Sequence, residues 1–305
     1  MGHEVIAGGD PRAFPIPWPG ASLSNGIEFL SHTVQRATGG AVAPLGRQTY
    51  YNVSFECLKQ ADLIILSSAE HYAPALTRRY PRWSELRMPK VAWYCESFHR
   101  DDRDFDFASC RPLVDRHYFP AIQDAEEMHG EWLPFSADVE VFKPNGASPI
   151  HSVAFLGTMY PKRAEYLRSL RIPISLLTPV SAWNTRRSFE RLASAYSSTQ
   201  IFLNLPALSR LLVTKVTEVM ACRTMLLTPE LDHPSALGNM APFESGRHLV
   251  YYAANKPAQL AELITHYLEH DEEREAIAEA GYQSVVNHHN LEQSLTRILR
   301  ESGLS

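Results

Sequence analysis

The pattern of apolar and polar positions in residues 200–230 predicts a strand, a loop, a helix and a second strand, and we take this unit as the centre of the fold. Two short apolar runs, residues 201–203 and 225–228, contain enough bulky side chains to be buried strands. Between them, a loop that contains a proline leads to Thr214, which can cap a helix that runs to about Cys222. A strand, a helix and a second strand of this length predict a parallel pair of strands.

Short apolar runs alternate with amphipathic stretches on both sides of this unit. Strands that alternate with helices along both halves predict an α/β fold with two domains, each containing a mostly parallel sheet. The other expected strands are residues 4–8, 63–66, 91–94, 115–120, 131–135, 152–156 and 174–177. The other expected helices are residues 26–36, 50–60, 189–196, 271–286 and 291–299. Two more are expected, one that follows residues 157–163 and ends at about Leu170, and one that follows Pro257 and includes residues 260–268.

A change in composition marks the expected domain boundary. Residues 133–146 leave the first sheet and end in Lys-Pro-Asn-Gly, which is typical of a linker. We therefore expect a first domain at residues 1–146, a second domain at 147–287 and a terminal helix at 288–305. Residues 11–20 carry four prolines and predict an irregular loop, and irregular loops of that length are often functional.

Basic residues occur where parallel sheets usually bind their ligands, which is beyond the carboxyl ends of the strands. Lys215 and Glu218 are three residues apart and share a helix face, which we expect not to be the face that packs the core. A cation beside a helix N-terminus suits a diphosphate, and a carboxylate one turn further can accept hydrogen bonds from sugar hydroxyls. Gly157 permits close backbone approach after a strand, and Arg163 offers a planar fork suited to a diphosphate. The simpler alternative for Lys215 and Glu218 is an exposed ion pair, which the spacing alone favours.

The first half places ionisable groups directly after an expected strand, in residues 95–104, CESFHRDDRD. Glu96 and His99 are the candidates for contact with a reacting group. The aspartates of this segment suit turns and helix caps. They could instead hold a divalent cation through their oxygens, but Arg100 and Arg103 would partly neutralise them.

The composition limits the kinds of protein that this chain can be. Its 305 residues, 45% apolar and 21% charged, indicate a globular protein with well-developed cores. Four widely spaced cysteines without a Cys-x-x-Cys pair fit reduced thiols in a cytoplasmic protein, and no run is as long as a membrane span.

The net charge of −5 gives no global attraction to nucleic acid. A basic and aromatic segment, residues 78–90, could still hold an anionic or nucleic-acid acceptor. A solvated helix face anchored by two rings is the simpler interpretation of that segment.

Several segments together resemble a known family. FLGTMYPKRAEYLRSL, IFLNLP, KVTEVMACRTMLLTPE, FESGRHLVYY and EREAIAEAGYQSVVNHHN occur in the order seen in CgeB-like glycosyltransferases. These are named after a spore maturation protein and belong to the group-1 glycosyltransferases of GT-B fold. The resemblance covers roughly residues 155–299, about half of the chain.

The resemblance implies two Rossmann-like domains that face each other across a cleft, with a nucleotide-sugar on the second domain. It implies a retaining, metal-independent transfer without a cofactor, in which the leaving phosphate itself takes the acceptor proton. Glu96 and His99 would then position the acceptor or the donor sugar, Lys215 would face phosphate and Glu218 would contact ribose. The terminal helix would cross back onto the first domain. The implied donor-binding residues are Gly157, Thr158, Arg163, Asn204, Thr214, Lys215 and Glu218.

The chain also departs from the family pattern. Arg210 occupies the position of a glutamate that group-1 enzymes often have, and Arg223 follows Ala-Cys where a glycine is common. Arg210 keeps open the alternative of an inactive nucleotide-sugar-binding partner subunit. A GT-B-like sugar epimerase is a second alternative. A phosphorylase of the pyridoxal-phosphate type is discounted, because it would need a buried Schiff-base lysine and a far longer chain. The sequence does not identify the acceptor, which could be a glycan, a protein or a nucleic acid.

Overall fold

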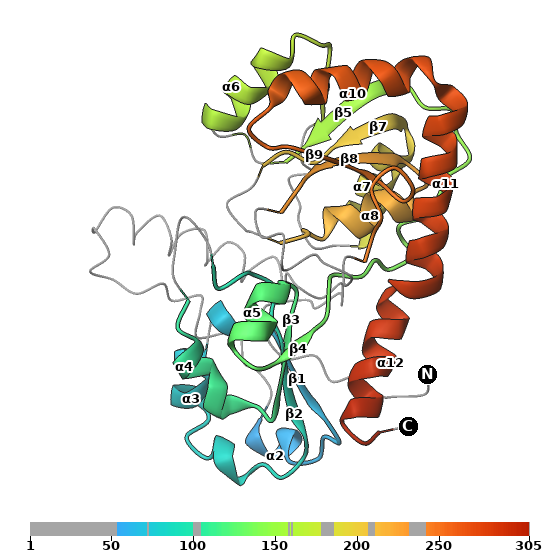
Figure 1. Cartoon of the computed structure of the whole chain (residues 1–305). Helices are drawn as coiled ribbons and strands as arrows, with labels where there is room; N and C mark the ends of the chain where they lie inside the picture. The colour runs from blue at the N-terminus through green and yellow to red at the C-terminus, as the bar shows by residue number, and fades with distance from the viewer. Residues whose placement is uncertain are drawn as a thin grey trace.

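A computed structural model of the chain describes residues 54–71, 73–99, 105–157, 159, 161–177, 186–206, 211–231 and 242–304. These residues form two lobes, each built around its own parallel sheet, as Figure 1 shows. The predicted α/β fold with two sheets is therefore confirmed. The strand expected at 4–8, the loop at 11–20 and the helix at 26–36 lie outside the described residues.

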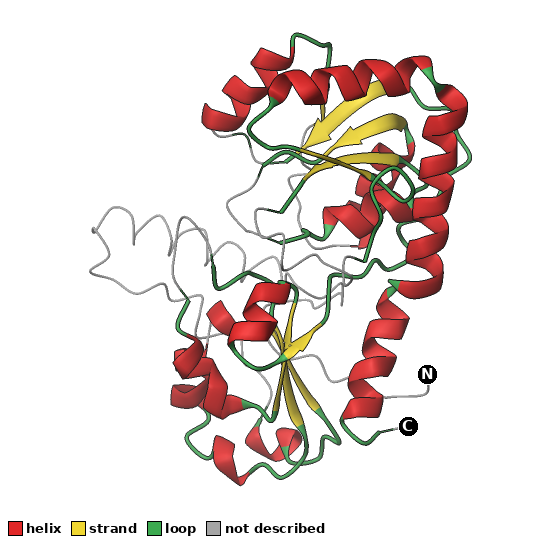
Figure 2. Cartoon of the chain, viewed as in Figure 1, coloured by secondary structure: helices red, strands yellow, loops and turns green. Residues whose placement is uncertain are grey.

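The first lobe contains a parallel sheet of four strands in the order β1-β2-β3-β4. All four strands overlap those expected from the apolar runs, and Figure 2 shows the helices around them. The strands are β1 Ile64–Ser67, β2 Lys90–Trp93, β3 Arg116–Phe119 and β4 Glu131–Trp132. The helices are α2 Phe55–Leu58, α3 Ala73–Arg79, α4 Phe107–Cys110 and α5 Ile122–Glu127.

The second lobe contains a parallel sheet of five strands in the order β6-β5-β7-β8-β9. Four of the strands were expected, whereas β9 was missed because its run of three residues is too short to show a period. The strands are β5 His151–Leu156, β6 Ser175–Leu177, β7 Thr199–Leu203, β8 Met225–Pro229 and β9 Val250–Tyr252.

Helices cover both faces of the second sheet, so its central strands are apolar on both sides. Phe202 of β7 faces one core with residues of α7, α8 and α11, whereas Ile201 and Leu203 face another core with residues of α6 and α10. No helix in the described ranges is long and apolar enough to cross a membrane. The helices are α6 Pro161–Leu170, α7 Arg186–Ser197, α8 Lys215–Ala221, α10 Pro257–Glu269 and α11 Asp271–His288.

The last helix, α12 Leu291–Glu301, contacts the first lobe. Asn290 caps it and also forms a backbone bridge with Ala137, which precedes the second sheet. Arg297 donates a hydrogen bond to the carbonyl oxygen of Trp132 at 2.9 Å. In Figure 1, α11 and α12 run along one side of the molecule, from the second lobe to the first. The chain therefore passes back to the lobe that contains its first described residues.

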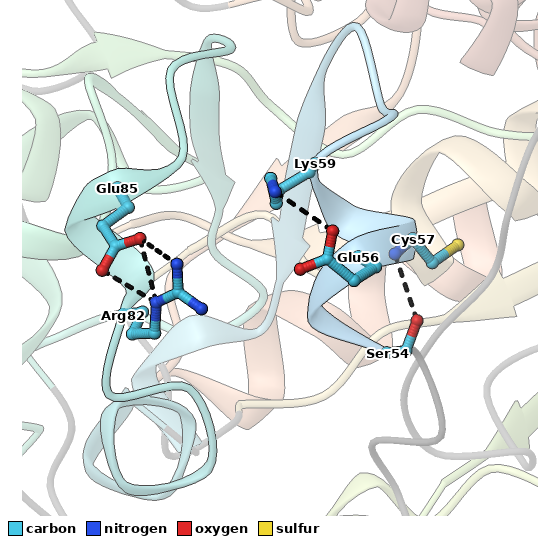
Figure 3. Close-up of polar contacts among 6 residues, drawn as sticks. All are labelled: Ser54, Glu56, Cys57, Lys59, Arg82 and Glu85. Atoms are coloured by element: carbon cyan, nitrogen blue, oxygen red, sulfur yellow. Dashed lines mark hydrogen bonds and ion pairs between the residues drawn. The ribbon is translucent and has the colours of Figure 1, made fainter.

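The basic and aromatic segment of the first lobe is engaged within the protein. Tyr80 and Trp83 are 7% and 6% exposed and anchor it to the core. Arg82 donates to both carboxylate oxygens of Glu85, at 2.8 and 2.9 Å from its Nε, as Figure 3 shows. The simpler interpretation, a helix face anchored by two rings, therefore describes Tyr80, Arg82 and Trp83. In the same view, Ser54 caps α2 by accepting from the backbone nitrogen of Cys57 at 3.1 Å.

Candidate functional site

Two cations converge at the carboxyl edge of the second sheet. The Lys215 Nζ donates to the carbonyl oxygen of Leu156, the last residue of β5, at 2.5 Å. Arg163 of α6 donates through Nη2 to the carbonyl oxygen of Pro206, after β7, at 2.9 Å. A Cβ at Gly157 would lie 3.3 Å from the Lys215 Nζ and 3.4 Å from the Arg163 Nη1. Both cations therefore approach the backbone directly after β5, and a side chain at position 157 would crowd them.

The surroundings of Lys215 are apolar and electropositive. Its ammonium lies 5.4 Å from the centre of the Phe155 ring and 6.0 Å from that of Phe202. Burial, together with the charge of Arg163, lowers the pKa of Lys215 to about 8. An anion bound at this edge would stabilise the protonated lysine and raise its pKa again. These two cations can therefore bind a phosphate group.

Glu218 lies one turn further along α8 and is half-buried. Its Oε2 accepts a hydrogen bond from the Tyr196 hydroxyl at 3.2 Å. Burial raises the pKa of Glu218, while the hydrogen bond from Tyr196 and the charge of Lys215 oppose that rise. Within the part of the chain that the structure describes, Glu218 forms no ion pair within 4.0 Å. The alternative of an exposed Lys215–Glu218 surface pair is therefore wrong.

The structure corrects two expectations about α8. Lys215 and Glu218 were expected to avoid the helix face that packs the core, but their side chains contact Phe155, Phe202 and Tyr196. Thr214 occupies the N-cap position with helical backbone angles, and its side chain makes no capping hydrogen bond. Thr214 is exposed at this edge, and its side chain forms a hydrogen bond with Glu218.

Asn204 has a structural role in the described residues. Its side-chain nitrogen Nδ2 donates to the Thr228 hydroxyl at 3.0 Å, and its backbone carbonyl oxygen accepts from the Tyr252 hydroxyl at 2.7 Å. The residue is 8% exposed. These bonds join the ends of β7, β8 and β9, and contact of Asn204 with a donor stays a prediction.

The first lobe brings His99 together with two carboxylates of α5. The His99 Nε2 lies 2.8 Å from the Glu127 Oε2 and 3.6 Å from the Asp124 Oδ1. Asp124 is fully buried, and its Oδ2 accepts from the backbone nitrogen of Phe98 at 2.9 Å. Both carboxylates thereby fix the segment after β2, while the His99 side chain keeps 33% exposure. Sequence reasoning found His99 but neither of its partners.

A second buried carboxylate at the same edge was also missed. Glu70 follows β1, and its Oε1 accepts from the backbone nitrogen of Cys95 at 2.9 Å. Burial raises the pKa of Glu70 to about 7. Backbone hydrogen bonds oppose this rise, and the nearby charge of Glu96 adds to it. Its other oxygen, Oε2, is buried and has no hydrogen-bond partner among the described residues. The rule that selected Glu96, a charged group just after a strand, would also have selected Glu70.

Several predicted residues cannot be placed. Thr158, Arg210 and the alternative metal ligands Asp101, Asp102 and Asp104 lie outside the described residues. Within the described ranges, no group of three or more histidine, cysteine, aspartate or glutamate side chains could hold a metal ion.

Comparisons with known proteins agree with the fold described above. Residues 150–300 match the model of a family described as glycosyl transferase-like. Sucrose-phosphate synthase from Thermosynechococcus elongatus has a TM-score of 0.59 at 12% identity, covering 95% of this chain and 81% of that chain. HepE of Anabaena in complex with UDP-glucose has a TM-score of 0.57 at 11% identity, covering 89% and 88%. A glycosyltransferase from Rickettsia africae has a TM-score of 0.53 at 9% identity, covering 94% and 82%.

No curated protein matches the sequence. At such low identity the solved structures show the fold alone. The family model indicates that residues 150–300 form a glycosyl transferase-like domain. The chain therefore has the GT-B fold, and its residues 150–300 match the glycosyl transferase-like family.

Proposed function

We propose that the protein transfers a sugar from a nucleoside diphosphate donor to an acceptor hydroxyl. The observation that carries this proposal is the convergence of Arg163 and Lys215 on Gly157 at the carboxyl edge of the second sheet. A diphosphate is the anion that such a donor places at this edge in an α/β fold. The complex of HepE with UDP-glucose makes UDP-glucose the first donor to test.

The residues of the second lobe divide the donor between them. Arg163 and Lys215 bind the diphosphate, and Glu218 accepts hydrogen bonds from the ribose hydroxyls. In the transfer, the acceptor oxygen bonds to the anomeric carbon while the bond from that carbon to the phosphate oxygen breaks. The acceptor proton passes to the leaving phosphate, and the configuration is retained. The two fixed cations stabilise the negative charge that grows on the diphosphate, without a metal.

The first lobe positions the acceptor or the transferred sugar. His99 and Glu96 follow β2 and carry this role, with His99 fixed by Asp124 and Glu127. His99→Ala and Glu96→Gln should reduce turnover and leave binding of the nucleoside diphosphate unchanged. Normal turnover in both variants with the right acceptor would contradict this assignment.

The decisive experiment incubates the purified protein with UDP-glucose and a panel of other nucleotide-sugars, with glycan, protein and nucleic-acid acceptors. Release of nucleoside diphosphate is measured, together with binding. A true donor at a hundredfold its dissociation constant should also stabilise the folded protein by about 2.7 kcal/mol. Transfer by the wild type and its loss in Lys215→Met would support the proposal. No binding of any donor would refute it.

The alternative proposal, an inactive nucleotide-sugar-binding subunit, is kept because Arg210 replaces a family glutamate. Binding of a donor without any turnover would favour that subunit. Membership of the CgeB-like subfamily is part of the main proposal, and it rests on the sequence segments alone.

A further inference from the structure

We propose that Tyr196 is a positioning residue that fixes the Glu218 carboxylate for the ribose hydroxyls of the donor. This inference rests on the proposed function of Glu218 and adds a residue to the donor site that the sequence did not point to. Tyr196 belongs to α7, which is separated from β7 by a single residue, and α7 packs against α8.

The Tyr196 ring has little freedom to move. The residue is 1% exposed, and its ring packs edge-on against Phe202 with 4.9 Å between the ring centres. The centre of the Phe142 ring lies 6.2 Å from that of the Tyr196 ring. The carbonyl oxygen of Tyr196 accepts a hydrogen bond from the Thr224 hydroxyl at 2.8 Å, which ties the end of α7 to the strand after α8. The hydroxyl is therefore held at a fixed point beside α8.

That hydroxyl donates to the Oε2 of Glu218, and a side-chain hydrogen bond with Thr214 also favours the ionised carboxylate. A carboxylate has about four acceptor positions, so these two hydrogen bonds leave capacity for a ligand. A side chain that is locked by packing and holds a functional group by a hydrogen bond gives the group one geometry. The hydrogen bond from Tyr196 also opposes the effect of burial on the pKa of Glu218, so it favours the ionised carboxylate. An ionised carboxylate only accepts hydrogen bonds, as binding of two ribose hydroxyls requires.

A second buried tyrosine–glutamate pair shows what a purely structural arrangement looks like in this chain. Tyr118 of β3 is fully buried and donates to the Glu301 Oε2 at 2.8 Å. The Glu301 Oε1 accepts from the Arg297 Nε at 2.8 Å, so both oxygens of this carboxylate have partners. Glu218 has no such cation within the described ranges. The pair at the donor edge is therefore the one with acceptor capacity left over.

The test compares binding of UDP with binding of 2′,3′-dideoxy-UDP, which lacks both ribose hydroxyls, by calorimetric titration. The wild type should bind UDP on the order of tenfold to a hundredfold more tightly than the dideoxy analogue. Tyr196→Phe keeps the ring and removes the hydroxyl, and it should lower this ratio about fivefold. Binding of the dideoxy analogue itself should change little. A general loss of packing would weaken both ligands equally.

Two further variants complete the experiment. Tyr118→Phe removes the matched hydroxyl in the first lobe, and it should lower the melting temperature without changing the UDP ratio. Glu218→Gln removes the carboxylate charge and should lower the ratio at least as much as Tyr196→Phe. Melting curves of all variants set a common titration temperature below the lowest transition, so a moderate loss of stability does not affect the readout.

The outcomes separate the two proposals. The readout is the ratio of the affinity for UDP to that for the dideoxy analogue. If Glu218→Gln lowers this ratio and Tyr196→Phe leaves it normal, the role of Tyr196 alone is overturned. A normal ratio in Glu218→Gln, or no binding of UDP, ADP or GDP to the wild type, would overturn the proposed donor site and this inference with it.

Discussion

The carboxyl edges of the two sheets differ in charge. At the second sheet, Lys215 and Arg163 approach the backbone at Gly157, and burial with like charge lowers the pKa of the lysine. At the first sheet, Glu70 and Asp124 are buried, and burial raises the pKa of both carboxyl groups. The two parallel sheets thus carry two neighbouring cations at one carboxyl edge and buried acids at the other.

This difference indicates a division of labour. Groups that are buried without full compensation cost stability, and folded proteins retain such groups mainly at functional sites. The cationic edge suits an anionic diphosphate. The acidic edge suits a neutral partner that donates hydrogen bonds, such as the hydroxyl groups of an acceptor. Four changes test the comparison, and they follow in order of decreasing expected effect.

Removal of both cations should have the largest effect. Arg163→Ala combined with Lys215→Met should weaken UDP binding on the order of a hundredfold or more, because each hydrogen bond to a charged group contributes about 1.5–3 kcal/mol. Uridine binding should change by less than about threefold, since uridine carries no phosphate. Calorimetric titration of UDP and uridine measures both effects, with Lys162→Met as an exposed control beside Arg163. Equal losses for the two ligands would show that the cations act on the fold and not on the phosphate.

The acidic edge should affect stability through Glu70. The folded protein holds this proton up to about pH 7, whereas an unfolded glutamate releases it near its ordinary pKa of about 4.3. The folded state therefore binds more protons in that window, and stability falls as the pH rises from about 4.5 to 7. Glu70→Gln keeps an acceptor for the Cys95 nitrogen and cannot ionise. At pH 8 it should be more stable than the wild type by up to about 3 kcal/mol.

Denaturant unfolding at pH 4.5 and at pH 8 measures this difference. Glu126→Gln, at an exposed position of α5, is the control and should leave the pH dependence as it is in the wild type. An unchanged pH dependence in Glu70→Gln would mean that Glu70 does not hold a proton at neutral pH.

The cationic edge should make UDP binding depend on pH through Lys215. Lys215 loses its proton near pH 8 in the free protein, and a bound diphosphate favours the protonated form. UDP affinity should therefore stay constant up to about pH 7.5 and then fall about tenfold by pH 9.5. Lys215→Arg should bind UDP with little pH dependence in that range, because arginine stays protonated. The same decline in both proteins would assign the titration to another group.

A change in the second lobe away from its edge should have the smallest effect and no effect on binding. Arg223 follows α8 with a φ of +56°, which favours glycine. Its guanidinium is paired with Glu279 of α11, but both side chains are largely exposed and the pair contributes little. Arg223→Gly should stabilise the protein by about 0.5–1 kcal/mol. Thermal unfolding measures this gain, and a loss of stability would mean that the ion pair outweighs the backbone strain.

The sequence by itself determined most of the secondary structure and half of the candidate site. The strands β5, β7 and β8 were expected because apolar runs bounded by turn residues depend on neighbours in the chain. Lys215 and Glu218 were found because helix geometry relates residues three positions apart. Arg163 and His99 were found because charged groups after a strand lie at the carboxyl edge of any parallel sheet.

Only the tertiary structure decided how these residues are used. Glu70, Asp124 and Tyr196 have partners 25, 26 and 22 positions away along the chain, and no local spacing relates such residues. The same holds for the face of α8. Whether Lys215 points to solvent or to the core depends on the rings of Phe155 and Phe202, which belong to two other strands. Periodicity predicts that a helix forms, whereas burial and partner groups, which set pKa values and leave acceptors available, arise only when distant elements pack together.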